Sequence, residues 1–298
     1  MAHNTNGAKP TEAKPTEAKA MNPTPEPQTD ARGVEIAPGP YGRVVSLVPS
    51  LTESIFGLGA QERLVGRTIY CIEPKGRLSG ILTCGGTKNP ELDTIRSLAP
   101  DLVLACVEEN KPEHIIGLEE GGVPVFAVMP RSLDDVSTLL RQYGVLLDAQ
   151  IVAGRTMADL TAARLHAGEF RVSLARPLRA ATLIWKKPWM VAGAGNHIDA
   201  VMKEVGLVNT MDDRGGYYEV ELDDLVARNL DLVLLPDEPF PFTHHASWSM
   251  AAAGVVPTRK QALVMDGKLL SWYGTRTARS LRALVKMMSG AVGGLEDT

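Results

Sequence analysis

Short continuous apolar runs alternate with helical patterns along most of the chain. Residues 43–48 form such a run, which Pro49 and Ser50 end, and this is typical of a parallel strand buried on both faces. Further strands are predicted at residues 64–69, 102–106, 123–128, 179–185, 190–191, 232–235 and 262–265. Helical patterns begin near residues 50, 91, 111, 197, 221 and 275. This alternation predicts an α/β fold with doubly wound parallel sheets.

One helix–turn–strand pattern occurs twice. Residues 91–110 read ELDTIRSLAPDLVLACVEEN, and residues 221–240, starting 130 positions later, read ELDDLVARNLDLVLLPDEPF. Both copies begin with Glu-Leu-Asp and carry Asp-Leu-Val-Leu in the middle. The duplication predicts two similar Rossmann-like lobes with a cleft between them.

The segment between the two copies has a different pattern. Apolar residues recur at helical spacing from 133 to 172, without a proline, for about 40 residues. We interpret this segment as one long or once-broken helix that joins the lobes as a rigid bridge. The expected organisation is therefore a disordered low-complexity tail at 1–40, an N-terminal lobe at 41–131, a linking helix at 132–174, a C-terminal lobe at 175–290 and a frayed tail at 291–298.

Composition narrows the function classes. The net charge of −4 and the lack of a Lys/Arg block disfavour nucleic acid as a partner, and no apolar run approaches the roughly 20 residues that span a bilayer. Three cysteines without CxxC spacing favour free thiols and a reducing compartment, with a Cys71–Cys84 bridge as the weaker alternative. No secretory signal precedes Val44, so we expect a cytoplasmic protein, or a periplasmic one if the true start lies upstream.

Candidate ligand-binding residues follow the predicted strands, because ligands collect at the carboxyl ends of parallel strands. The turn at 84–88 is too short for a P-loop, and we expect it to turn the backbone toward the cleft. Many candidates are aromatic, which favours a small-molecule pocket over the alternative that they cap the core. The candidates are Ser50, Tyr70, Cys71, Lys88, Glu108, Asn110, Trp185, Lys187, Trp189, Glu238, Phe240, Trp272, Tyr273 and Arg276.

Catalytic and metal sites have little support in the sequence. No Gly-x-Ser-x-Gly elbow occurs, and the adjacent His244 and His245 point apart on a regular element, so we expect neither a catalytic residue nor a bare-metal site. Glu108 and Glu109 could perform acid–base work, but on a strand only one of them would enter the cleft.

Asp93 and Asp223 occupy equivalent positions in the two copies. An acid in the first turn of a helix is stabilised by the helix dipole, which alone explains both residues. The functional alternative is that two symmetric exposed acids grip a basic partner.

The chain resembles the helical-backbone (class III) substrate-binding proteins of ABC importers for cobalamin, haem and ferric siderophores. The similarity rests on RVVSLVPSLTESIFGLG, GGTKNPELDTIRSLAPDLVLACVEEN and GKLLSWYG and extends over residues 43–288. It implies ligand capture between two lobes with little hinge motion, no cofactor and a monomer. In this family one acid on each lobe docks onto the permease, and those positions fall on Asp93 and Asp223, where glutamate is the commoner residue.

The similarity is strongest to a signal-less subset of helical-backbone metal receptors and cobalamin-binding-like proteins. Members of this subset share the residues that correspond to Cys71, Glu108, Asn110, Trp272 and Tyr273, which implies a common ligand.

Two functional hypotheses follow. The first is a binding protein for a corrinoid, ahead of haem or a ferric siderophore, linked to an ABC permease. In it Trp185, Trp189, Phe240, Trp272 and Tyr273 stack on the ligand, Lys88, Lys187 and Arg276 meet its phosphate or carboxylate groups, Ser50 and Asn110 orient it, and Cys71 contacts the metal. The second is a cytoplasmic enzyme or corrinoid-handling protein that uses Cys71 and Glu108 in the same cleft.

Overall fold

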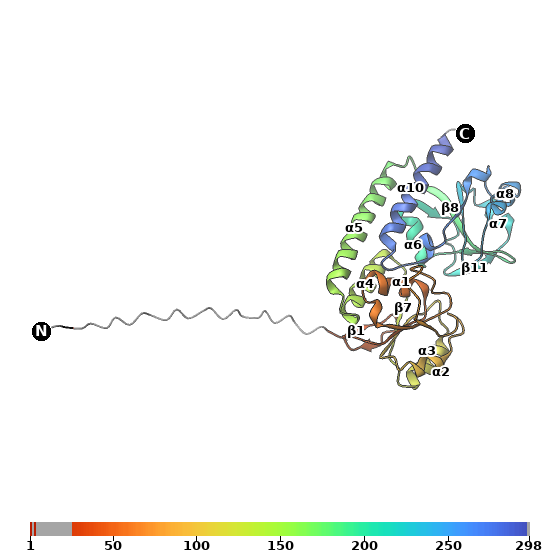
Figure 1. The fold of residues 1–298 in the computed structure, drawn as a ribbon. Coiled ribbons are helices and arrows are strands. Elements are labelled where there is room, and N and C mark those ends of the chain that lie inside the picture. Colours follow the sequence, from red (N-terminus) through yellow and green to blue (C-terminus); the bar gives the residue numbers. More distant parts are fainter. Residues whose placement is uncertain (2, 4–25, 297–298) are drawn as a thin grey trace.

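The N-terminal lobe contains a five-stranded parallel sheet. The computed structural model describes residues 1, 3 and 26–296 (Figure 1). The strands of this five-stranded sheet lie in the order β5-β4-β3-β6-β7. The elements of this lobe are β3 (Val44–Ser46), α1 (Pro49–Gly57), the 3-10 helix η1 (Gln61–Arg63), β4 (Leu64–Arg67), β5 (Leu82–Thr83), α2 (Leu92–Ser97), β6 (Leu102–Cys106), α3 (Pro112–Glu120) and β7 (Val125–Val128).

Both faces of this sheet are buried, which explains the continuous apolar runs. Val45, Val103 and Val125 pack with Ile95 of α2 and Ile115 of α3 on one face. The alternate residues of the same strands belong to the other core cluster, with side chains of α1 and the connecting helices. The two-residue period of a strand therefore supplies two cores, one on each face.

The sheet of the C-terminal lobe is mixed, not purely parallel as expected. Its main path is β11-β9-β8-β12-β13, with β10 also paired to β8. Strand β9 runs antiparallel to β8 because only a tight turn separates the two, and β11 runs antiparallel to β9. The elements are β8 (Leu178–Trp185), β9 (Trp189–Ala192), α6 (His197–Glu204), β10 (Leu207–Asn209), β11 (Tyr217–Val220), α7 (Leu222–Ala227), β12 (Leu232–Pro236), α8 (His244–Ala252), η2 (Arg259–Gln261), β13 (Ala262–Met265), α9 (Lys268–Ser271) and α10 (Thr277–Glu296).

The duplicated sequence pattern corresponds to duplicated structure. Helix α7 and strand β12 begin and end 130 residues after α2 and β6. The correspondence extends to the parallel strands: β4-β3-β6-β7 in one lobe matches β10-β8-β12-β13 in the other. The strand ends that we predicted to carry the site therefore occur once in each lobe.

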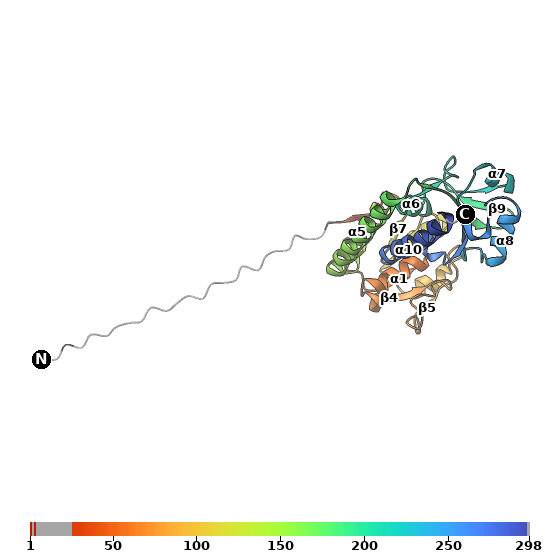
Figure 2. The same ribbon diagram turned by 90° about the horizontal axis from the view of Figure 1, so that it is seen from above.

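Two helices connect the lobes, α4 (Leu133–Leu146) and α5 (Gln150–Ser173). The chain breaks between them at Leu147–Ala149, where Asp148 adopts a left-handed φ of 53°. Helix α5 has 24 residues and is therefore about 36 Å long. It runs along one side of the molecule, with both lobes on the other side (Figures 1 and 2).

Helix α5 is tied to its neighbours by packing and by ion pairs. Leu160, Ala163 and Ala167 belong to a single core cluster that includes residues of both lobes. Arg164 pairs with Asp134 of α4 and with Glu204 of α6, at 2.6 and 3.0 Å, respectively. Arg282 of α10 pairs with Asp159 at 2.6 Å. The connector is therefore stiff, because α4 and the helices α6 and α10 of the C-terminal lobe hold α5 in place.

Both ends of the chain differ from the expected tails. Most of residues 1–25 and residues 297–298 lie outside the described residues, but residues 26–40 are ordered around a short antiparallel pair, β1 (Gln28–Thr29) and β2 (Glu35–Ile36). The buried Asp30 accepts a hydrogen bond from the backbone N–H of Ala127 and pairs with Arg32, which also pairs with Glu119. At the other end, α10 continues to Glu296, so the fraying expected from residue 291 is wrong for residues 291–296.

Candidate functional site

Acidic and aromatic side chains from the two lobes meet at the carboxyl ends of the duplicated strands. We call Glu108, Glu109, Tyr217, Glu238 and Tyr273 the inter-lobe face. The Tyr273 hydroxyl donates a hydrogen bond to Glu109 Oε1 at 3.4 Å, which joins the loop after β6 to the loop before α10. The Tyr273 ring also contacts the ring of His197 edge-on, with centroids 5.5 Å apart.

The environment of Glu109 favours its protonated form. Burial, together with the charges of Glu108 and Glu238, raises the pKa of this carboxyl to about 7. Lys88 and the Tyr273 hydrogen bond lower the pKa but do not offset the burial. Glu109 is thus a carboxyl that can hold or release a proton near neutral pH.

The other acids of the inter-lobe face have raised pKa values for the same reason. Burial raises the pKa of Glu108 against the charges of Arg131 and Lys88, and it raises the pKa of Glu238 against the charge of Lys268. The neighbouring cations therefore do not compensate the carboxyl groups fully.

Tyr217 of β11 is 41% exposed and lies within electrostatic reach of Glu108 and Glu109. Desolvation of its hydroxyl raises the pKa of Tyr217, and the charges of these two acids raise it as well. This residue, like Glu109, was not among the predicted site residues. The signal available in the sequence was the pair Tyr217-Tyr218 after Gly215-Gly216, whose alternation sends one ring to each face of a strand.

Four aromatic rings of the C-terminal lobe form a cluster. Trp185 contacts Phe240 edge-on at 5.6 Å between centroids, and Phe240 contacts Phe242 at 4.8 Å. Trp189 stacks on Phe242 at 6.3 Å, and Lys186 lies 5.2 Å from the centre of the Trp189 ring. Trp185 remains 41% exposed, so the cluster offers an aromatic surface as well as a core. The structure thus brings together three predicted site residues, Trp185, Trp189 and Phe240, and their role in ligand binding stays a prediction.

Trp272 is packed, not open. Its ring is 7% exposed and lies between Lys268 and Arg276, whose cationic groups are 5.7 and 5.1 Å from its centre. Beside it, Ser271 donates a hydrogen bond to Glu238 at 3.3 Å. Tyr273 is likewise buried at 4% exposure, so these two rings support the site more than they face solvent.

Three predicted ligand contacts are engaged inside the protein, which contradicts the roles given to them. Cys71 is fully buried, and its sulfur lies 3.0 Å from the Thr52 hydroxyl and 3.1 Å from that of Thr68. Burial raises the pKa of the Cys71 thiol, which disfavours the thiolate form. All three cysteines are free and buried, as favoured from the sequence.

Asn110 and Arg276 are the other two. The Asn110 side chain accepts from the Cys106 N–H at 2.8 Å and donates to the Thr87 carbonyl at 2.9 Å, which fixes the 84–90 turn against β6. Arg276 donates two hydrogen bonds to Glu53 at 2.6 and 2.8 Å, and Arg279 pairs with the same carboxylate. The guanidinium of Arg276 therefore neutralises a buried acid of α1 and is not free for a ligand.

The remaining predicted residues lie at the edges of the site. Lys88 donates to the Glu108 carbonyl at 2.9 Å, while Tyr70 and Lys187 are exposed. Ser50 is buried in the first turn of α1, and its hydroxyl has no hydrogen-bond partner among the described residues.

Asp93 and Asp223 are exposed in the first turns of α2 and α7, at corresponding places on the two lobes. In Figure 1 both helices lie on the side away from α5. Asp93 pairs with Arg96 at 2.8 Å.

The residues that the structure describes contain neither a membrane-spanning helix nor a cluster of metal ligands. In this part of the chain, no helix is both long and apolar enough to cross a bilayer. Within the same residues, no three His, Cys, Asp or Glu side chains gather closely enough to hold a metal ion.

Comparisons with known proteins agree with this architecture. The vitamin B12-binding protein of Vibrio cholerae (strain O395) is 22% identical over 249 residues, which cover 83% of this chain and 88% of that protein. The structure of the periplasmic haem-binding protein RhuT of Roseiflexus sp. RS-1 is 22% identical, with a TM-score of 0.72 over 84% of this chain and 98% of that one. The structure of the periplasmic vitamin B12-binding protein BtuF of Vibrio cholerae is 19% identical, with a TM-score of 0.71 over 85% of this chain and 98% of that one.

These likenesses confirm the two-lobed α/β fold with its long connecting helix. A family model described as periplasmic binding protein matches residues 44–249, which span the first lobe, the connector and most of the second lobe. The chain belongs to the periplasmic binding protein family.

Proposed function

We propose that this protein binds a corrinoid of the cobalamin type at the inter-lobe face and delivers it for ABC-type import. Family membership supports a binding role, and the similar proteins are described as binding vitamin B12 or haem. We choose a corrinoid over haem because the carboxyl groups at the inter-lobe face are not fully compensated by cations.

The charge of the inter-lobe face suits a ligand rich in amides. A corrinoid ring carries neutral primary amides, whose N–H groups can donate to the carboxyl oxygens of Glu108, Glu109 and Glu238. Haem carries two propionates, and many ferric siderophores are anionic. A carboxylate of such a ligand would lie beside three carboxyl groups whose pKa values are already raised. Its negative charge would raise these pKa values again, and this repulsion would weaken binding.

Aromatic surface supplies the apolar contact. Trp185 and Phe240 present an edge-on pair on the C-terminal lobe, and Tyr217 lies beside the acids. A large, partly planar ring covers such a surface well, because aromatic side chains bury much area with little loss of conformational freedom.

An enzyme that uses Cys71 and Glu108 is disfavoured. The Cys71 sulfur is fully buried and lies against two threonine hydroxyls, so it presents no exposed nucleophile to a ligand. We therefore propose binding without catalysis.

The family relationship also favours a place of action outside the cytoplasm, contrary to the expectation from the sequence. In that compartment Asp93 and Asp223 would provide the contacts to a permease, one from each lobe. We propose that the free protein is a monomer.

The test is an absorbance titration of the purified protein with hydroxocobalamin and with haemin. We expect hydroxocobalamin to bind more tightly, and Trp185→Ala with Phe240→Ala to weaken binding by tenfold or more, about 1.4 kcal/mol. Trp248→Ala is the matched control, since Trp248 is an exposed tryptophan of α8 outside the aromatic cluster. Tighter binding of haemin would overturn the ligand choice, and failure of both ligands to bind would overturn the proposed function.

A further inference from the structure

The outer face of the connecting helix carries large apolar side chains that no part of the molecule covers. Helix α5 turns its buried residues toward the core, and its opposite face points away from both lobes (Figures 1 and 2). On that outer face Ile151, Leu165 and Val172 are 76%, 67% and 84% exposed. Apart from Met1, these are the three most exposed large apolar side chains of the described residues. Apolar surface gathered on one face in this way marks an interaction site.

These residues belong to a regular pattern with alternating spacings of three and four. We call the pattern the outer seam, and it consists of Ile151, Gly154, Ala158, Thr161, Leu165, Gly168 and Val172. Six of the seven are exposed, Gly168 is half-buried and none is charged. A groove of about 770 Å³ is lined in part by the last four of them. Uncharged a and d positions over three heptads are typical of a helix that pairs with another helix.

The outer seam is complementary to itself when two copies of α5 lie antiparallel. With Leu165 of one copy opposite Thr161 of the other, each larger side chain meets a smaller one. The layers are then Val172 against Gly154, Leu165 against Thr161 and Ala158 against Gly168. Each layer occurs twice, because the two copies are related by a two-fold axis. The small residues provide the space into which the larger side chains of the other copy fit.

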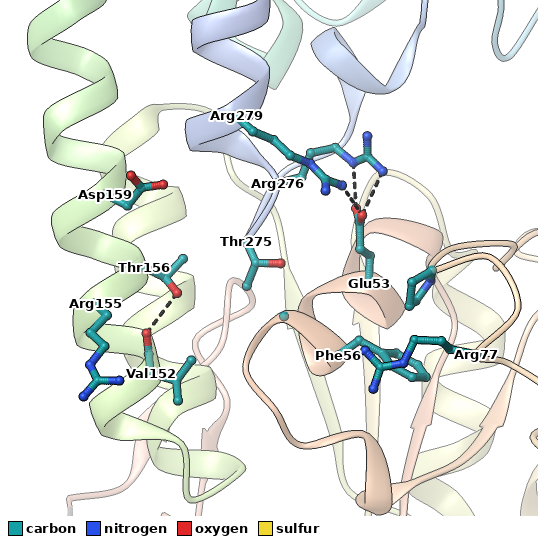
Figure 3. A pocket seen from close by; sticks show the side chains of 12 residues that line it. Glu53, Phe56, Arg77, Val152, Arg155, Thr156, Asp159, Thr275, Arg276 and Arg279 are labelled. Carbon is teal, nitrogen blue, oxygen red and sulfur yellow. Dashed lines mark hydrogen bonds and ion pairs between the residues drawn. The ribbon is translucent and has the colours of Figure 1, made fainter.

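Charged residues beside the outer seam favour the same arrangement. Arg155 and Glu169 both follow a d position directly, and in an antiparallel pair such positions face each other, so Arg155 of each copy lies beside Glu169 of the other. Arg155 is exposed and turned away from Glu53 and Arg77 of the first lobe (Figure 3). The Glu169 side chain is 81% exposed and approaches only His166 of its own helix, at 3.9 Å, within the described residues. Both charges are therefore available to a second copy.

The other flank of the outer seam does not oppose this pairing. Arg164 lies on that flank and would approach its own counterpart near the two-fold axis. Its charge is already neutralised by Asp134 at 2.6 Å and by Glu204 at 3.0 Å. The repulsion between the two copies of Arg164 is therefore small.

We propose that α5 is a self-association surface, and that its partner is a second copy of this chain, paired antiparallel along the outer seam. Three heptads is about the shortest run that supports such pairing. The association is therefore weak, and the monomer proposed above for the free protein is its state in dilute solution. The pair leaves the inter-lobe face open, because none of the residues of that face belongs to the outer seam.

The test is sedimentation equilibrium of the full chain over a series of concentrations up to its solubility limit, at low ionic strength. We expect an equilibrium between monomer and dimer. Leu165→Glu should weaken the association about tenfold or more, because it places a carboxylate in each half of an apolar interface. Ile116→Glu is the matched control, since Ile116 is 51% exposed on α3, and it should leave the association unchanged.

Charge variants test the orientation of the pair. Arg155→Glu should weaken the association about threefold or more, because it places two acids side by side at both ends of the interface. Addition of Glu169→Arg to the same chain should restore the association, because each pair again has opposite charges. A double variant that associates no better than Arg155→Glu alone would overturn the antiparallel arrangement.

Two further results would overturn the proposal. One is a monomer at every concentration, which would exclude a second copy as the partner of this face. The other is a dimer that Leu165→Glu retains at full strength, which would place the interface elsewhere. Leu165→Glu should titrate with hydroxocobalamin as the unaltered protein does, so this test and the test of the inter-lobe face fail separately.

Discussion

Glu109 is a carboxyl surrounded by groups from both lobes. Burial and the charges of Glu108 and Glu238 raise its pKa, whereas Lys88 and the hydrogen bond from Tyr273 lower it. Alongside burial, the charge of Glu109 in turn raises the pKa of Tyr217. Its pKa of about 7 in the folded protein lies above the ordinary value of 4.5, so the folded protein holds this proton more tightly than the unfolded chain does. Stability from this group is full below pH 4.5 and is lost as the pH rises through about 7.

Glu109→Gln should remove this pH dependence. The variant should gain on the order of 1–2 kcal/mol of unfolding free energy, relative to the unaltered protein, between pH 5 and pH 8, after allowance for partial solvent access. Urea denaturation across that range measures the difference. Glu120→Gln, at an exposed carboxyl of α3, should show no such trend, and a difference for Glu109→Gln that stays constant with pH would contradict the assignment.

Glu53 provides a second prediction at the residue scale. Its side chain and that of Arg276 are 11% and 10% exposed, so Glu53→Gln leaves a buried guanidinium without its charge partner. We expect a loss of about 3–5 kcal/mol in unfolding free energy. Asp159→Asn breaks a pair to the same helix α10 whose side chains are 56% and 41% exposed, and it should cost about 1 kcal/mol or less. Equal losses in the two variants would be inconsistent with the difference in burial.

Sequence reasoning located the strand ends but misassigned individual side chains on them. Arg276 follows the last strand, yet its partner Glu53 is 223 residues away and has no signal in the local pattern. Cys71 likewise depends on Thr52 of α1, which approaches it only in the folded lobe. The aromatic cluster was predictable because its members lie near strand ends: Trp185 ends β8, Trp189 begins β9, and Phe240 follows β12.

At the scale of elements, the contact of α1 with the loop before α10 determines how closely the lobes approach. Gly57 ends α1, and a Cβ at this position would lie 2.7 Å from the Thr275 Cβ and closer still to its hydroxyl. No side chain fits there without a shift of one element against the other.

Gly57→Ala should therefore destabilise the protein by about 1–3 kcal/mol. Gly154→Ala is the matched control on α5, where nothing lies within 4 Å of the added Cβ, and it should stabilise the helix by up to about 1 kcal/mol. Thermal unfolding distinguishes the two variants by the sign of the change. A stabilised Gly57→Ala variant would show that the α1–α10 contact yields easily.

The elements themselves were largely predictable, with two exceptions. The helical pattern at 133–172 was correct, but the break at Asp148 depends on one left-handed residue that the hydrophobic period does not reveal. The antiparallel pairing of β8 with β9 was missed because two short apolar runs have the same appearance in parallel and antiparallel sheets.

At the scale of the whole molecule, the duplication places one exposed acid on each lobe at equivalent positions. If these acids dock onto a permease, Asp93→Asn with Asp223→Asn should reduce uptake of the ligand by tenfold or more in cells. Its affinity for the purified protein should stay unchanged, because neither residue contacts the inter-lobe face. Asp134→Asn, an exposed acid of α4 on the connector, is the control, and a double variant with normal uptake would argue against docking at these positions.

One core cluster includes residues of both lobes and of α5, and this has a consequence for ligand affinity. A protein that already has its ligand-binding conformation loses little conformational entropy when the ligand binds. Most of the free energy of the contacts therefore contributes to affinity. Small-angle scattering of the empty and loaded protein should accordingly give the same radius of gyration. Rapid release of the ligand would then require a partner molecule that binds both lobes and moves them apart.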